Sequence, residues 1–200
     1  MKHYLLLLHG YTQNGKIIKK KITKLLSKTF LQDYIIISPD GPYIIDSDNE
    51  KRGWWELKSP EIFTQEHEYN DYEKAIEAIN KNILSMQNID KLTIIAFSQG
   101  TVILEIMIAN NLLKIKPNKI ILLSPSGIMD KKLLKNDKIT NIPSIVMFGE
   151  KEGVFNITPE HYQKYSSIKL DNYLVHIHKQ GHVIPSKSNE KKIIKNFLSL

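Results

Sequence analysis

The segment Ala96-Phe97-Ser98-Gln99-Gly100 stands between a short apolar run and a helical pattern that is apolar on nearly all sides. A strand, a sharp turn and a helix in this order form a nucleophile elbow, which lifts a serine hydroxyl clear of the chain at a helix N-terminus. Glycine is usual where Ala96 stands, and alanine adds one methyl group there. A serine that merely caps a buried helix would give a similar pattern. The context favours Ser98 as a nucleophile.

A histidine that could activate this serine follows the last apolar run, in the segment Gln180-Gly181-His182. Imidazole can take the serine proton and return it to a leaving group, because its pKa lies near neutrality. A histidine that only sits in a surface loop is the simpler alternative. Because the serine precedes the histidine, as in the triads built on such elbows, we predict that His182 is the general base.

The third member of such a triad is an acid that orients the imidazole and stabilises its charged form. In the same chain order the acid lies between the serine and the histidine, after a strand. The segment that follows the fifth apolar run offers Glu152, which we predict as the acid, and Glu150 as the second choice. Asp171 is a third and more distant candidate.

Two backbone amides could hold the negative oxygen that forms when a serine attacks a carbonyl carbon. One is the N–H of Gln99, the residue after the nucleophile. The other is the N–H of Tyr11, in the glycine-hinged turn His9-Gly10-Tyr11 that follows the first apolar run. We expect His9 itself to hydrogen-bond its own loop, which is a structural role.

The elements that must position these residues alternate along the chain. Short apolar runs rich in β-branched residues predict buried parallel strands at 4–8, 34–37, 92–97, 119–123, 144–148 and 173–177. Patterns with a period near 3.6 residues predict helices at 16–30, 70–86, 101–113, 158–166 and 190–198. This alternation predicts an α/β layered fold in one domain over residues 1–200. In such sheets ligands bind beyond the carboxyl ends of the strands, where the candidate residues stand.

Composition excludes several other classes of protein. The chain has 200 residues, of which 42% are hydrophobic and 24% charged, as in ordinary globular proteins. It has no cysteine, which excludes disulfides, Cys-based zinc sites and a thiol nucleophile. The net charge of +7 comes from scattered lysines, with Arg52 as the single arginine, so we expect no nucleic-acid partner. The leucine run near the N-terminus is too short for a signal peptide or a membrane span, which predicts a cytoplasmic protein without an integral membrane segment.

Five blocks together resemble the FSH family of serine hydrolases, which are related to acyl-protein thioesterases and small carboxylesterases. They run from Leu8 to Gly15, from Pro39 to Pro42, from Arg52 to Trp55, from Phe97 to Gly100 and from Gly181 to Pro185. The resemblance implies a three-layer α/β-hydrolase fold with a mostly parallel sheet of about six strands. It also implies hydrolysis of carboxylic esters by a Ser-acid-His triad, without a cofactor or a metal.

The resemblance further suggests roles for individual residues. Trp54 and Trp55 match paired tryptophans that would wall the substrate pocket, although ordinary core packing is nearly as good an account. Arg52 matches an arginine that would brace a loop. Glu152 stands where the family commonly has aspartate. The short stretch 128–141 leaves no room for a large lid, so we expect an open pocket for a small-molecule ester with a short or medium acyl chain.

Other functions remain open at this stage. A thioester substrate would use the same machinery, and a peptide is a weaker possibility. A non-catalytic binding protein could be built on the same scaffold. A metal enzyme could use His176 and His178, which alternation places on one face of a strand, together with His182. The oligomeric state is not predicted.

Overall fold

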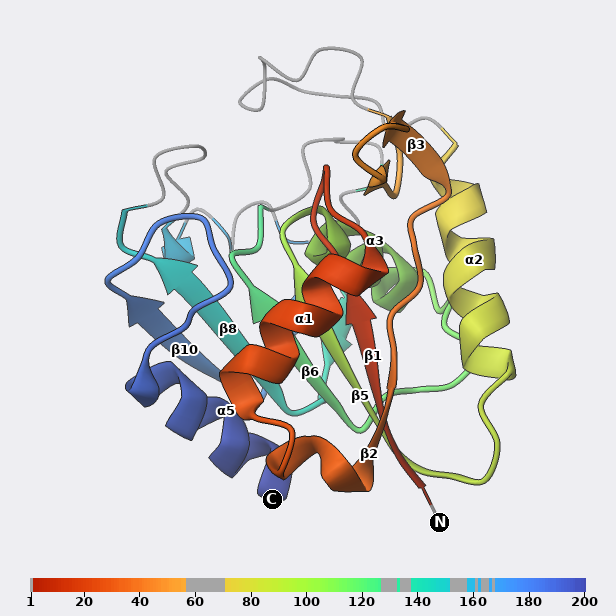
Figure 1. Ribbon diagram of the computed structural model, residues 1–200. Helices are drawn as coiled ribbons and strands as arrows, with labels where there is room; N and C mark the ends of the chain where they lie inside the picture. The colour runs from red at the N-terminus through yellow and green to blue at the C-terminus, as the bar shows by residue number, and fades with distance from the viewer. Residues whose placement is uncertain are drawn as a thin grey trace.

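A six-stranded sheet, in which every neighbouring pair is parallel, forms the centre of the protein (Figure 1). The computed structural model describes residues 2–56, 71–126, 133, 138–151, 158–160, 162, 166 and 168–200. The strand order across the sheet is β10 (Tyr173–His178), β8 (Ser144–Gly149), β6 (Lys119–Leu123), β5 (Ile89–Phe97), β1 (Lys2–Leu8) and β2 (Tyr34–Ile37). All the strands therefore end at the same edge, which is the upper edge in Figure 1.

Burial follows the position of each strand in the sheet. The central strands β1, β5, β6 and β8 are apolar runs whose residues are mostly buried on both faces, as parallel strands between two helical layers must be. The edge strands β2 and β10 are only partly buried. The prediction of six parallel strands is confirmed, with β1 and β5 beginning two and three residues earlier than the apolar runs suggested.

Helices cover both faces of the sheet, which gives three layers (Figure 1). The helices α1 (Gly15–Leu26) and α5 (Ser188–Ser199) pack on one face, and α2 (Tyr72–Leu84) and α3 (Gln99–Ala109) pack on the other. Three of these helices bury one apolar stripe each, whereas α3 is buried from residue 99 to residue 108. A helix that is apolar all round belongs in the interior, and α3 is the helix that starts at Ser98.

Three helices are shorter than their patterns predicted, among them α2, which was predicted over 70–86 and runs over Tyr72–Leu84. The helix predicted over 16–30 stops at Leu26, because Ser27 has a φ of 73°, which no right-handed helix can continue. A separate 3₁₀ turn, η1 (Phe30–Asp33), follows. The helix predicted over 101–113 stops at Ala109, before Asn111 with a φ of 55°. Of the helix predicted over 158–166, the structure describes residues 158–160, 162 and 166, and the helical bond from the Tyr162 N–H to the Thr158 carbonyl (2.9 Å) is present.

Two small sheets were not predicted. The strands β3 (Tyr43–Asp46) and β4 (Lys51–Gly53) form an antiparallel hairpin beside the upper edge of the main sheet (Figure 1). The strands β7 (Lys138–Thr140) and β9 (Ile168–Leu170) pair in parallel. Each of these strands has three or four residues, which is too short to show a period in the sequence.

The three-layer α/β fold is therefore confirmed. Among the described residues, no helix combines the length and the apolar character that a membrane crossing requires. The stretch 128–141, predicted to leave no room for a lid, lies largely outside the described residues. The organisation as one domain over 1–200 stays a prediction.

Candidate active site

Ser98 occupies a sharp turn between β5 and α3, with a φ of 51° and a ψ of −120°. A positive φ is rare for a residue other than glycine, and it persists only where surrounding contacts enforce it. Two such contacts are hydrogen bonds at the turn: the Ser98 N–H donates to the Leu123 carbonyl at 3.1 Å, and the Ser98 carbonyl accepts from the Thr101 N–H at 2.8 Å. The structure thus gives Ser98 the strained elbow geometry that the sequence predicted.

Gly100 permits this turn because α3 starts very close to β1. A Cβ atom at Gly100 would stand 2.5 Å from the Leu8 carbonyl oxygen and 2.8 Å from that of His9. Both oxygens belong to the backbone, one at the last residue of β1 and one at the residue after it, so they cannot move aside. Ala96, which stands where glycine is usual, is fully buried in the core and pairs with Leu8 and Leu122 on the neighbouring strands.

His182 lies against Ser98. Its Nε2 is 2.8 Å from the Ser98 Oγ, although the two residues are 84 positions apart in the chain. The ring of Phe97, the residue before the serine, lies 5.4 Å from the imidazole, centroid to centroid. A hydroxyl and an imidazole at this distance and in this order are arranged for transfer of the serine proton.

The loop that carries His182 is held largely by contacts to backbone atoms. The end of β8 reaches it through two bonds, from the Glu150 N–H to the His178 carbonyl (2.7 Å) and from the Lys151 N–H to the Gln180 carbonyl (3.3 Å). Gly149 lets the two segments approach, since a Cβ there would stand 2.4 Å from the Gly181 oxygen. These contacts join the His182 loop to the strand end where the acid was predicted.

The predicted acid, Glu152, lies outside the described residues. Glu150, the second choice, is exposed at the end of β8, and its carboxylate has no hydrogen-bond or ion-pair partner among the described residues. Asp171 precedes β10, whereas His182 follows it, so the length of a six-residue strand, roughly 20 Å, separates them. That separation makes the third choice wrong.

On the other side of Ser98, the turn after β1 surrounds a fully buried His9. Its Nε2 accepts a hydrogen bond from the Gly41 N–H at 2.8 Å, so the ring proton sits on Nδ1, which donates to the Gly10 carbonyl at 2.8 Å. Burial lowers the pKa of His9 from 6.5 to about 4, and the ring is therefore neutral. This geometry agrees with the structural role expected of His9. Tyr11 belongs to the same turn, and its ring lies next to Gly53.

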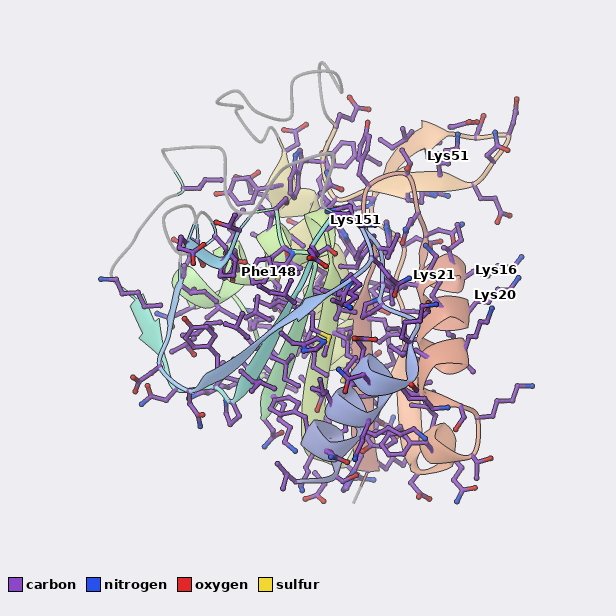
Figure 2. The ribbon with its side chains drawn as sticks, turned by 90° about the vertical axis from the view of Figure 1, so that its left-hand side faces the viewer. Lys16, Lys20, Lys21, Lys51, Phe148 and Lys151 are labelled. Atoms are coloured by element: carbon purple, nitrogen blue, oxygen red, sulfur yellow. The ribbon has the colours of Figure 1, made fainter. Side chains whose placement is uncertain are left out.

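The helix α1 carries several lysines, and one of them lies near the ring of Phe97, the residue before Ser98. Lys16, Lys20 and Lys21 project from that helix, and Lys151 lies at the end of β8 (Figure 2). The Lys21 Nζ is 5.9 Å from the centre of the Phe97 ring, and the His182 ring also lies near that ring, with centroids 5.4 Å apart. Partial burial lowers the pKa of this ammonium group. The Phe97 ring is therefore near both a lysine and the predicted base.

A protein-family model, described as serine hydrolase (FSH1), matches residues 1–194. The chain belongs to this family. The predicted resemblance is thereby confirmed, and so is the class of enzyme: this FSH1-family protein is a serine hydrolase.

Individual relatives of this FSH1-family hydrolase are distant. The esterase OVCA2 of Danio rerio is 24% identical over 221 residues, covering 97% of this chain and 95% of that protein. The structure of an uncharacterized protein from Bacillus cereus ATCC 10987 matches with a TM-score of 0.68 at 15% identity. The match covers 99% of this chain and 59% of that one. A carboxylesterase from Mesorhizobium loti has a TM-score of 0.67 at 14% identity, with 100% of this chain and 89% of that one covered. At such identities the two structures establish the α/β-hydrolase fold alone.

The paired tryptophans of this FSH1-family hydrolase are core residues in the structure. Trp54 is 0% and Trp55 is 2% exposed. The Trp54 ring stacks on His9, with centroids 4.8 Å apart, and its Nε1–H donates to the His9 carbonyl at 2.7 Å. Neither indole reaches the surface here, so the geometry favours core packing over the predicted pocket wall. The Arg52 backbone N–H donates to the Gln13 carbonyl at 2.8 Å, a bond that does not depend on the arginine side chain, so the bracing role of that side chain stays a prediction.

Two positioning contacts were missed from the sequence. Ser124, which follows β6 and is fully buried with a φ of 45°, has its Oγ 3.3 Å from the Val183 carbonyl in the His182 loop. The Gln99 side chain bonds to the backbone of both tryptophans. The position of Ser124 at a strand end was a usable signal, because all strand ends of a parallel sheet meet there. Nothing in the sequence pointed to the Gln99 side chain.

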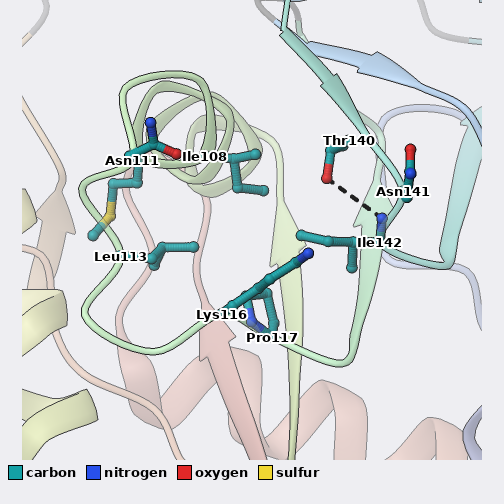
Figure 3. A pocket seen from close by; sticks show the side chains of 9 residues that line it. Ile108, Asn111, Leu113, Lys116, Pro117, Thr140, Asn141 and Ile142 are labelled. Carbon is teal, nitrogen blue, oxygen red and sulfur yellow. Dashed lines mark hydrogen bonds between the residues drawn. The ribbon is translucent and has the colours of Figure 1, made fainter.

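The metal alternative finds no support among the described residues, where no group of three or more His, Cys, Asp or Glu side chains could hold an ion. His176 instead bonds Glu190 at the start of α5, with Nε2 and Oε1 3.0 Å apart. His178 is buried, with 2% of its surface exposed, although β10 is an edge strand. A pocket of about 310 Å³ near the C-terminal end of α3 contains none of the predicted site residues (Figure 3).

Proposed function

We propose that this serine hydrolase cleaves carboxylic esters through an acyl-enzyme on Ser98, with His182 as the general base. The observation that carries the proposal is the 2.8 Å contact between the His182 Nε2 and the Ser98 Oγ at a turn with a positive φ. An esterase among the relatives supports the choice of an ester. The substrate in this proposal is a small molecule with a short or medium acyl chain.

The proposed reaction begins when the Ser98 Oγ attacks the ester carbonyl carbon while His182 takes the hydroxyl proton. The carbonyl oxygen becomes negative and accepts hydrogen bonds from the N–H groups of Gln99 and Tyr11. Gln99 suits this role because it is the first residue of α3, whose first amides have no acceptor within the helix. The protonated His182 then gives its proton to the leaving alcohol. Water, activated by the same imidazole, releases the acid and restores Ser98.

Glu152 is the acid in this proposal. The support is its place in the chain, after β8 and before His182, where triads of this fold carry their acid. A further support is that the two residues before Glu152 are bonded to the segment that leads to His182, through the N–H groups of Glu150 and Lys151. A thioester would pass through the same steps, with a thiol in place of the alcohol.

The test is labelling with a fluorophosphonate, which reacts with activated serines, in the wild type, in Ser98→Ala and in Ser85→Ala. Ser85 is an exposed serine after α2 and serves as the matched control. We expect label in the wild type and in Ser85→Ala, and none in Ser98→Ala. Hydrolysis of p-nitrophenyl esters should fall roughly 10⁴- to 10⁶-fold in Ser98→Ala.

A folded wild-type protein that takes no label would contradict the proposal and favour a binding protein on a hydrolase scaffold. Label that persists in Ser98→Ala would place the nucleophile elsewhere.

A second experiment addresses the substrate. The wild type is assayed on a series of p-nitrophenyl esters of increasing acyl length and on the thioesters of the same acids, which compares the acyl preference and the leaving group directly.

A further inference from the structure

The side chain of Gln99 forms a clamp on a segment that lies 45 residues earlier in the chain. Its Oε1 accepts a hydrogen bond from the Trp54 N–H at 2.9 Å, and its Nε2 donates to the Trp55 carbonyl at 3.1 Å. Gln99 is 5% exposed, and both tryptophans are buried. A buried amide whose oxygen and nitrogen are both bonded holds its partners in one arrangement, because either bond, if broken, would leave a buried polar group unpaired.

The clamped segment in turn holds the turn after β1. The Trp54 Nε1–H donates to the His9 carbonyl at 2.7 Å, and the indole lies stacked on the His9 ring. His9 completes the path through its bonds to Gly10 and Gly41. A continuous set of buried hydrogen bonds therefore runs from the residue after the nucleophile to the turn that contains Tyr11.

This path joins four of the five blocks that carried the resemblance in the sequence: the blocks at 8–15, 39–42, 52–55 and 97–100. The two proposed oxyanion donors, the N–H groups of Gln99 and Tyr11, belong to two of these blocks. An oxyanion hole works only if its donors are already placed about 3 Å from the position of the developing charge. A brace that fixes the two donors relative to each other supplies that placement.

We infer that the Gln99 side chain is a positioning group of the oxyanion hole, distinct in its task from the Gln99 backbone N–H. It fixes the segment at Trp54 and Trp55, and through Trp54 and His9 it fixes the turn that presents the Tyr11 amide. This inference rests on the proposed function, because it assumes that Ser98 is acylated and that the two amides bind the resulting oxyanion.

The test compares Gln99→Met with Asn80→Leu. Methionine keeps the length of the glutamine side chain and removes both hydrogen bonds. Asn80 is a matched control, because it is also a buried amide that bonds a backbone carbonyl (Leu112, 2.8 Å) and a backbone N–H (Lys114, 3.1 Å), and it lies in α2, away from Ser98. We expect both variants to melt several degrees below the wild type.

The two variants should differ in catalysis. Active sites are first counted by fluorophosphonate titration, and kcat is expressed per labelled site. We expect Gln99→Met to lower kcat by roughly 10- to 100-fold with KM changed less than about threefold, because the lost placement acts on the transition state. Inhibition by phenylboronic acid, whose serine adduct is tetrahedral, should weaken in parallel with kcat/KM. Asn80→Leu should retain the wild-type kcat and boronate inhibition.

A second variant covers the possibility that Gln99→Met does not fold. Gln99→Asn keeps a neutral amide on a side chain one methylene shorter, which cannot reach both the Trp54 N–H and the Trp55 carbonyl, so its kcat should fall between those of the wild type and Gln99→Met. The inference is overturned if folded Gln99→Met, or Gln99→Asn where Gln99→Met is insoluble, matches the wild type in kcat per labelled site and in boronate inhibition. A wild type that takes no fluorophosphonate overturns the proposed function instead, so the two failures are distinguishable.

Discussion

The two sides of Ser98 are built differently. On the side of β1, the contacts run through buried side chains: His9 and Trp54 are 0% exposed and Gln99 is 5% exposed. On the side of β8 and β10, the contacts are mainly between backbone atoms, and His182 is only half-buried, with Glu150 and Lys151 exposed beside it. The first side lies next to a central strand, and the second lies at the edge of the sheet.

The difference corresponds to two chemical tasks. Stabilising a developing negative charge needs donors that are fixed in advance, because reorientation during the reaction costs free energy. A general base must instead exchange its proton with the leaving group and with water, which requires access. The rigid half of the site therefore lies in the core, and the half that moves protons lies near the solvent.

Replacing His182 in one variant and His9 in another should give the largest difference between the two sides of Ser98. His182→Ala should lower kcat by roughly 10⁴- to 10⁶-fold and change the free energy of unfolding by less than about 1 kcal/mol, because the ring is half-buried. His9→Phe should destabilise the fold by about 3 kcal/mol, since it leaves the buried Gly41 N–H without an acceptor. Ester hydrolysis and urea unfolding measure the two effects. If His182→Ala and His9→Phe lost equal amounts of unfolding free energy, the proposed difference between the two sides would be wrong.

The two glycines that allow close backbone approach provide the next contrast. Gly100→Ala sets a methyl group against the backbone of a buried strand, and we expect a loss of about 3 kcal/mol or more in stability. Gly149→Ala meets the Gly181 and Gln180 oxygens, which belong to a partly exposed loop that can shift. We expect it to lose about 1 kcal/mol of stability while kcat falls, because His182 moves with that loop. Thermal melts and kcat per labelled site would test this, and an unfolded Gly149→Ala would contradict it.

The neutral His9 makes stability depend on pH. Its pKa is lowered from 6.5 to about 4 by burial, so the unfolded chain binds a proton as the pH falls through 6.5 while the folded protein does not. Stability is therefore complete above pH 6.5 and is lost as the pH falls towards 4. Between pH 6.5 and 5 the loss from this group should be about 2 kcal/mol.

Other carboxyl and imidazole groups also titrate in this range, so the measurement is a difference. Unfolding free energies of the wild type and of His9→Gln are compared from pH 7 to pH 5, because glutamine can accept the Gly41 hydrogen bond but takes no proton. The wild type should lose about 2 kcal/mol more than the variant. Parallel curves would mean that His9 is not the group responsible.

Strand positions and the serine–histidine pair were predictable because each has a local signature. A buried parallel strand is a continuous apolar run, and an elbow is a short pattern between a strand and a helix. Helix ends were predicted less well: α1 and α3 stop at Ser27 and near Asn111, where positive φ angles interrupt a pattern that continues in the sequence. The sequence indicated an acid only through the order of a triad along the chain, and Glu152 remains a prediction. The sequence already held the argument against Asp171, because the strand predicted at 173–177 stands between Asp171 and His182 and places them at opposite ends of the sheet.

By itself, the sequence determined the layered α/β fold, the FSH1 family and the two residues that meet at 2.8 Å. These follow from periodicity and from short blocks, which are properties of neighbours in the chain. Only the tertiary structure decided that Trp54 and Trp55 face the core, that His9 is neutral and bonded at both nitrogens, and that Gln99 clamps a distant segment. The physical reason is that burial and hydrogen-bond partners depend on residues tens of positions away, which become neighbours only when the sheet and its helices have packed.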